Sequence, residues 1–144
     1  MSAARLGPAI AWTSDLAIGV PELDKQHREL FRRAERLVLA LEAADRGEVD
    51  PLVHSLSDFL VSHLECEERW MAEAEYPKLG PHRDAHWRFK DEVRERTRAY
   101  QRQGPSPAMA LAVHDWLAGW LFPHVGGPDL EFGRWLASHD GRPG

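Results

Sequence analysis

The sequence has little of what disulfide-linked, membrane-spanning or nucleic-acid-binding proteins require. Its 144 residues include one cysteine, Cys66, which excludes an internal disulfide and favours a reducing compartment. No apolar run approaches the roughly 18 residues that span a bilayer, and we expect no secretory signal in the first residues. The net charge of −5 argues weakly against nucleic acid as a partner. These features predict a soluble cytoplasmic protein with no membrane and no nucleic-acid partner.

Alternating runs of Val, Ile and Thr, the pattern that indicates β-strands, are also absent. Apolar residues instead recur at intervals of three and four, which places them on one face of a helix. Proline and glycine lie at the ends of these stretches, where they favour the start or the end of a helix. We therefore expect helices over residues 21–44, from Asp50-Pro51 to about residue 74, over 81–103, from Ser106-Pro107 to a stop at Gly126-Gly127-Pro128, and over 130–137.

Four amphipathic helices joined by short loops predict an all-α fold, an antiparallel up-down-up-down four-helix bundle. The first twenty residues predict an irregular N-terminal arm, and the last stretch predicts a short C-terminal helix. At this length a single domain over residues 1–144 is expected, with its core over about 12–136.

Histidine is unusually frequent, with eight residues in the chain. Five of them, and one glutamate, lie in phase with the apolar residues of their own predicted helices. A bundle core normally consists of Leu, Ile, Val, Phe and Ala, and burying an unpaired imidazole or carboxylate costs several kcal/mol. A metal centre would satisfy all of these groups together. The inward-facing set is His27, His63, Glu67, His82, His86 and His124.

The spacing of these residues supports a metal centre. His63 and Glu67 are separated by four residues, so both point the same way from one helix. His82 and His86 repeat this arrangement on the next helix. Asp129 follows His124 by five residues, across the Gly-Gly-Pro segment that is able to turn its carboxylate inward.

Five imidazoles and two carboxylates are too many ligands for one metal ion. Zinc takes three or four protein ligands, whereas calcium and magnesium prefer oxygen. Two six-coordinate ions bridged by the two carboxylates fit this set better. Carboxylate-bridged pairs in helical bundles are typically iron or manganese.

The candidate ligands lie in a series of short motifs along the chain. These are Trp12, Ile18-Gly19-Val20, Leu23-Asp24-Lys25-Gln26-His27, His63-Leu64-Glu65-Cys66-Glu67-Glu68, Tyr76-Pro77, His82, His86, Trp120-Leu121-Phe122-Pro123-His124-Val125 and Asp129. On these motifs the chain resembles the hemerythrins, most closely the single-domain bacterial members, over roughly residues 12–132. All seven positions that carry the family's metal ligands hold the expected residue type.

The resemblance implies a non-haem centre of two iron ions (Fe2+/Fe3+) with an oxo or hydroxo bridge. One iron would be held by His82, His86 and His124, and the other by His27 and His63. Glu67 and Asp129 would bridge the two ions. The iron with two histidines would keep an open position for dioxygen.

The function implied is reversible dioxygen binding for oxygen storage, delivery or scavenging, without catalytic residues. Two alternatives remain open at this point: a di-iron enzyme acting on peroxide, nitric oxide or dioxygen, and an oxygen or redox sensor. Weak peroxidase-like or oxidase-like activity is compatible with a carrier. The expected partner is dioxygen, with an unidentified reductase or oxygen-consuming enzyme as a further candidate.

An apolar wall around the open position would admit oxygen and exclude water. The residues expected to form it are Trp120, Leu121, Phe59 and Leu60. The remaining histidines, His54, His114 and His139, lack partner spacing and are expected to lie outside the site. Cys66 falls off the ligand face, so we expect it to pack between helices.

Overall fold

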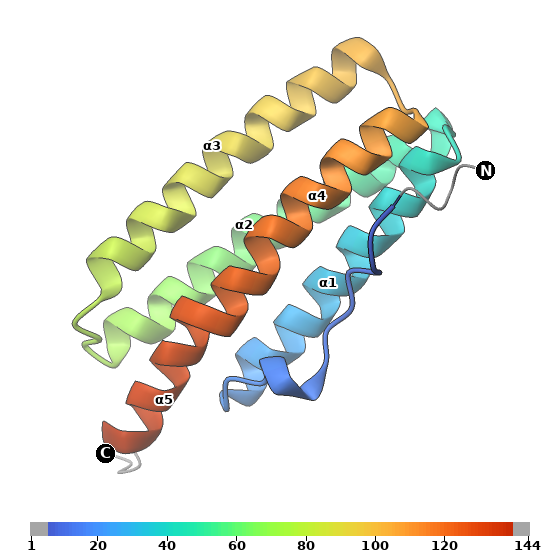
Figure 1. The fold of residues 1–144 in the computed structure, drawn as a ribbon. Coiled ribbons are helices and arrows are strands. Elements are labelled where there is room, and N and C mark those ends of the chain that lie inside the picture. Colours follow the sequence, from blue (N-terminus) through green and yellow to red (C-terminus); the bar gives the residue numbers. More distant parts are fainter. Residues whose placement is uncertain (1–5, 140–144) are drawn as a thin grey trace.

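Four long helices run alternately up and down the molecule and form one antiparallel bundle (Figure 1). The computed structural model describes residues 6–139, and within that range it contains helices and no strand, which confirms the all-α prediction. No helix among these residues is long and apolar enough to cross a membrane. The helices are α1 (Pro21–Glu42), α2 (Arg46–Glu73), α3 (Leu79–Gln103), α4 (Pro107–His124) and α5 (Leu130–His139), with short turns η2 (Ser14–Leu16) and η3 (Val125–Asp129).

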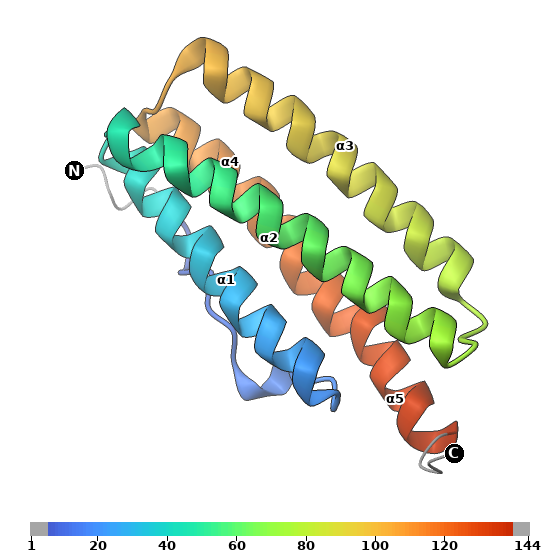
Figure 2. The ribbon, with the colours of Figure 1, turned by 180° about the vertical axis from the view of Figure 1, so that it is seen from behind.

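The apolar core lies mainly between α1, α2 and α4, and α1 packs closely against both of the others. Its fully buried side chains include Leu30, Phe31 and Leu117. α3 stands on the opposite side of the bundle from α1 in both ribbon views (Figure 2). It joins the core through fewer side chains, among them Phe89, which stacks on Trp120. The bundle is therefore tight on the two sides where α1 meets α2 and α4, and looser along α3.

α2 begins at Arg46, so the prediction that this helix starts at Asp50-Pro51 is wrong. Asp45 caps the helix instead, because its side chain accepts a hydrogen bond from the backbone N–H of Glu48. Pro51 lies in the second turn, where it removes one backbone donor without ending the helix. Asp50 has a different role. Its Oδ1 accepts a hydrogen bond from the hydroxyl of Tyr100, with 2.6 Å between the two oxygens, and this bond joins α2 to α3.

α4 ends at His124, next to the predicted stop at Gly126-Gly127-Pro128, but the chain does not leave the helical path there. α4, η3 and α5 form one continuous rod (Figure 1). η3 is a π-helical turn, in which the backbone N–H of Leu130 reaches the carbonyl of Val125. Proline clashes with the carbonyl four residues before it in an α-helix, and the wider π turn relieves this clash. The chain passes Pro128 and continues as a helix.

Residues 6–20 of the N-terminal arm are irregular apart from η2, as predicted, and are fixed by side chains of the bundle, while residues 1–5 of the predicted arm lie outside the described residues. The buried carboxylate of Asp24 accepts the backbone N–H groups of Ile18 at 2.8 Å and Gly19 at 3.1 Å. Glu35 accepts the N–H of Ile10 at 2.9 Å. His114 is buried in α4 and its Nε2 lies 2.8 Å from the carbonyl oxygen of Pro8. The arm is thereby attached to both α1 and α4.

Gly133 of α5 provides a test of this packing, because it is buried directly against the carbonyl of Ile18. A Cβ at residue 133 would overlap that carbonyl oxygen, whereas a Cβ at the exposed Gly119 of α4 would meet nothing within 4 Å. We expect Gly133→Ala to lower the free energy of unfolding by ~1–3 kcal/mol. Gly119→Ala should raise it by up to ~1 kcal/mol. Urea unfolding of both variants measures the difference, and equal stability would contradict the close approach of α5 to the arm.

Candidate metal centre

Seven buried side chains converge inside the bundle, toward the end where α2 gives way to α3. They come from all four long helices and the π turn, and none is more than 7% exposed. The structure brings together all seven residues that the sequence singled out as ligands. They are His27 of α1, His63 and Glu67 of α2, His82 and His86 of α3, His124 of α4 and Asp129 of η3.

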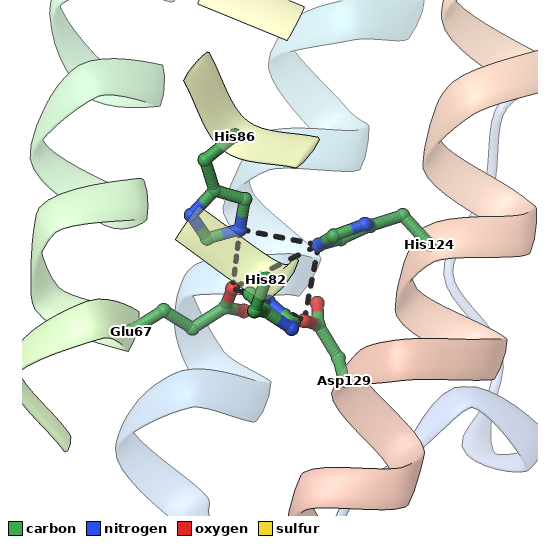
Figure 3. Close-up of side chains that lie close together, drawn as sticks. All are labelled: Glu67, His82, His86, His124 and Asp129. Carbon is green, nitrogen blue, oxygen red and sulfur yellow. Dashed lines mark hydrogen bonds and ion pairs between the residues drawn. The ribbon is translucent and has the colours of Figure 1, made fainter. Parts of the chain in front are cut away.

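These residues form two overlapping groups of metal-binding atoms. The three-histidine group contains Glu67, His82, His86, His124 and Asp129, and Figure 3 shows their side chains pointing toward one another. The two-histidine group contains His27, His63 and again Glu67 and Asp129. Within each group the candidate ligand atoms all lie within 4.8 Å of one another. The two carboxylates are the members that both groups share.

Glu67 presents a different oxygen to each group. Its Oε2 lies 2.9 Å from Nε2 of His27 and 3.2 Å from Nε2 of His63. Its Oε1 lies 3.2 Å from Nε2 of His82 and 3.1 Å from Nε2 of His86. A carboxylate with one oxygen on each side is placed to bridge two cations.

Asp129 is divided between the groups in the same way. Its Oδ2 lies 3.2 Å from Nε2 of His27, while its Oδ1 lies 3.0 Å from Nε2 of His82 and 3.2 Å from Nε2 of His124. The π turn produces this placement, because it turns the residue fifth after His124 toward the bundle axis.

The hydrogen bonding of the site fits a bound cation. Both oxygens of Asp129 are buried without a hydrogen-bond partner, although three imidazole nitrogens lie within about 3.2 Å of them. The Nε2 atoms of His86 and His124 face each other at 3.2 Å. Buried acceptor oxygens that lack a hydrogen-bond donor are costly. Metal ions between these atoms would satisfy them.

The charges of the site also depend on one another. Burial lowers the pKa of His27, but the carboxylates of Asp129 and Glu67 outweigh this and raise it to about 10. The same opposing causes raise the pKa of His82 to about 9. Burial alone would raise the pKa of Glu67, yet the neighbouring imidazoles, His63 first, hold it well below its usual range. Burial and the charge of Glu67 would raise the pKa of Asp129, but His124 and His27 lower it below its usual range, so both carboxylates are ionised and available to a cation.

Two residues to which the sequence analysis gave no role orient the candidate ligands. Gln26 Oε1 accepts the Nδ1–H of His63 at 2.8 Å, and Glu68 Oε2 accepts the Nδ1–H of His86 at 2.8 Å. An acceptor at Nδ1 leaves Nε2 free as a metal ligand. Gln26 precedes a ligand and Glu68 follows one, but both reach a histidine on a neighbouring helix. Sequence spacing within one helix gives no signal for such contacts.

The residues expected to form an apolar wall lie in different surroundings. Trp120 is half-buried and stacks on His124, with ring centroids 4.1 Å apart. Leu121 and Leu60 are fully buried in the core. Phe59 is half-buried, and the guanidinium of Arg33 lies 4.6 Å from its ring centre. Their part in an oxygen pocket stays a prediction.

The other histidines and Cys66 lie outside the two groups. His54 and His139 are exposed, and His114 holds the N-terminal arm. Cys66 is buried between α2 and α1, and the Nε2 of Gln26 lies 3.5 Å from its sulfur.

Comparison with known proteins agrees with this geometry. The family model described as "Hemerythrin HHE cation binding domain" matches residues 18–136, most of the chain and all seven converging side chains. The chain belongs to the hemerythrin family. The matched family is described as cation-binding, and both groups of donor atoms lie within the matched residues.

Individual relatives of this hemerythrin domain cover nearly its whole length. The Bacteriohemerythrin of Stenotrophomonas maltophilia (strain R551-3) is 28% identical over 130 residues, which span 90% of this chain and 83% of the relative. The Bacteriohemerythrin of Ralstonia nicotianae is 30% identical over 135 residues, 90% of either chain. A Hemerythrin-like protein of Naegleria gruberi is 28% identical over 122 residues, 84% of this chain and 88% of its own.

The hydrogen bond from His86 to Glu68 predicts how firmly the domain retains metal. We expect Glu68→Ala to weaken metal affinity by about 10–100-fold, because the imidazole loses the acceptor that fixes its orientation. Glu65→Ala is the matched control, since Glu65 is an exposed acidic residue of the same helix. Iron retained against a competing chelator measures the effect. Equal retention by the two variants would show that Glu68 does not orient a ligand.

Proposed function

We propose that this hemerythrin domain binds dioxygen reversibly at a carboxylate-bridged pair of iron ions. The observation that carries the proposal is the division of the two carboxylates, each of which presents one oxygen to the three-histidine group and one to the two-histidine group. This arrangement favours two ions over one. A single ion would bind one oxygen of each carboxylate and leave the other oxygen of each without a cation.

The donor atoms favour iron over other metals. Five imidazole nitrogens and two carboxylates suit iron, whereas calcium and magnesium prefer all-oxygen sites. Structural zinc sites are tetrahedral and closed, and seven converging ligands exceed their needs. When bound, a ferrous pair with an oxo or hydroxo bridge supplies and recovers the electrons that reversible oxygen binding requires.

The unequal groups favour ligand binding on one side. The three-histidine group offers five donor residues, and the two-histidine group offers four. At equal coordination number the second group leaves one more position for an exogenous molecule. A small neutral molecule such as dioxygen fits a position enclosed by fully buried side chains.

The protein side chains hold protons and exclude water. Gln26 and Glu68 keep the Nδ1 protons of two candidate ligands in place. Leu121 is fully buried and lies one turn before His124, on the same side of α4. Burial and fixed tautomers stabilise one bound state, which suits a carrier better than an enzyme that needs a mobile acid or base. Storage, delivery and scavenging of oxygen are the uses that this property supports.

Replacement of one candidate ligand tests the iron site. We expect the purified chain to hold two iron atoms, and the anaerobically reduced protein to gain a charge-transfer absorption band on exposure to oxygen. His82→Ala should lose that band and part of the iron, because a buried donor is removed. His54→Ala, a change at an exposed histidine, should leave both unchanged. A native chain with one iron atom, or with stoichiometric zinc, would contradict the proposal.

Truncation of Leu121 tests the expected apolar wall. We expect Leu121→Ala to shorten the lifetime of the oxygenated protein, because a smaller side chain admits water and protons to the site. Leu39→Ala, at a half-exposed position on α1, is the control. The decay of the absorption band over time measures the lifetime. If the Leu121 and Leu39 variants decay at the same rate, Leu121 does not guard the oxygen position.

A further inference from the structure

A second site lies between α2 and α3, along the stretch of the bundle that leads away from the metal centre. Its open part is a groove of about 590 Å³, within the size range of small-molecule pockets. A smaller cavity of about 50 Å³ lies beneath it, toward α1 and α4. The groove and the cavity share six lining residues and are thus next to one another. These are Val53, Ser57, Leu60, Val93, Thr97 and Tyr100.

The inner cavity is apolar. Its floor is formed by Leu37, Leu56 and Leu117, which are buried in the core. Trp116 forms one wall, and the guanidinium of Arg96 lies over that ring, 5.1 Å from its centre. The loose packing of α3 accounts for the cavity, because its inner face there carries the short side chains Val93 and Thr97.

The rim of the groove is positively charged in a chain of net charge −5. Lys90, Arg94 and Arg98 follow one another at intervals of four residues and form one stripe of α3. Arg46 of α2 adds a fourth cation, beside the ring of Tyr100. Asp50 is the one carboxylate that lines the groove, and it accepts the hydroxyl of Tyr100. The rim is therefore suited to an anion.

We propose that this groove binds a single-chain amphiphile with an anionic head group, the chemistry of a free fatty acid. The alkyl chain lies along the apolar part of the groove, and its end reaches the smaller cavity, where burial of the apolar surface drives binding. The carboxylate lies at the cationic stripe, where opposite charges select it. A second copy of the chain is a poorer occupant, since a two-fold interface over this groove would place the cationic stripe against itself.

Calorimetric titration of the purified, metal-loaded chain with dodecanoate tests this site, at concentrations where dodecanoate is monomeric. We expect saturable binding of one molecule per chain, and weaker binding of the neutral analogue dodecanol. The double variant Arg94→Glu/Arg98→Glu should lower dodecanoate affinity by about tenfold or more, because attraction becomes repulsion, and should leave dodecanol affinity unchanged. Arg69→Glu, at an exposed position of α2 outside the groove, should change neither.

The position of the alkyl chain has its own test. A dodecanoate brominated at its terminal carbon should quench tryptophan fluorescence, and Trp116→Phe should remove most of that quenching, because Trp116 lines the cavity. Equal affinity for dodecanoate and dodecanol, insensitivity to the double charge reversal, or quenching that persists without Trp116 would each overturn the proposal. So would a native dimer that the charge reversal dissociates, which would make the groove an interface between copies. None of these measurements involves oxygen, so their outcome is independent of the proposed function.

Discussion

The structure depends on two ionised carboxylates held among five imidazoles in a space closed to water. Glu67 and Asp129 are each within about 3.2 Å of at least three ring nitrogens and are almost completely buried. Such a cluster is costly unless its members compensate one another or share a cation. Every long helix contributes to it, so the register of the bundle and the geometry of the site determine each other.

Much of this arrangement was predictable because helical phase is a local property of the sequence. His63 with Glu67, and His82 with His86, share a face through their four-residue spacing alone. The contacts between helices were not predictable in this way. The bonds of Gln26 to His63 and of Glu68 to His86 depend on which helices become neighbours and how far their side chains reach. The start of α2 was misplaced for a similar reason, since Asp50 serves Tyr100 of another helix and leaves capping to Asp45.

α3 is held firmly to the other helices near both of its ends and packs loosely between them. At one end His82 and His86 hold it to the other helices through the buried cluster. Phe89 fills the next turn by stacking on Trp120. Beyond Phe89 the inner face of α3 carries small side chains, and its outer edge carries cationic ones. At the far end, the hydrogen bond from Tyr100 to Asp50 holds α3 to α2. A helix fastened at both ends and loosely packed between them gives the domain room for a groove without loss of the metal centre.

The π turn at Val125–Asp129 makes the length of this segment as important as its composition. In an α-helix, which turns by about 100° per residue, residues four apart share a face. The wider π turn takes one more residue to come round, so Asp129 faces the histidines although it lies five residues after His124. Loss of one glycine would turn the segment into an ordinary α-helical one and leave the carboxylate four residues after the histidine, still on its face. An inserted residue would instead move the carboxylate, and Gly133 behind it, about 100° further round the helix, away from the histidines and the carbonyl of Ile18.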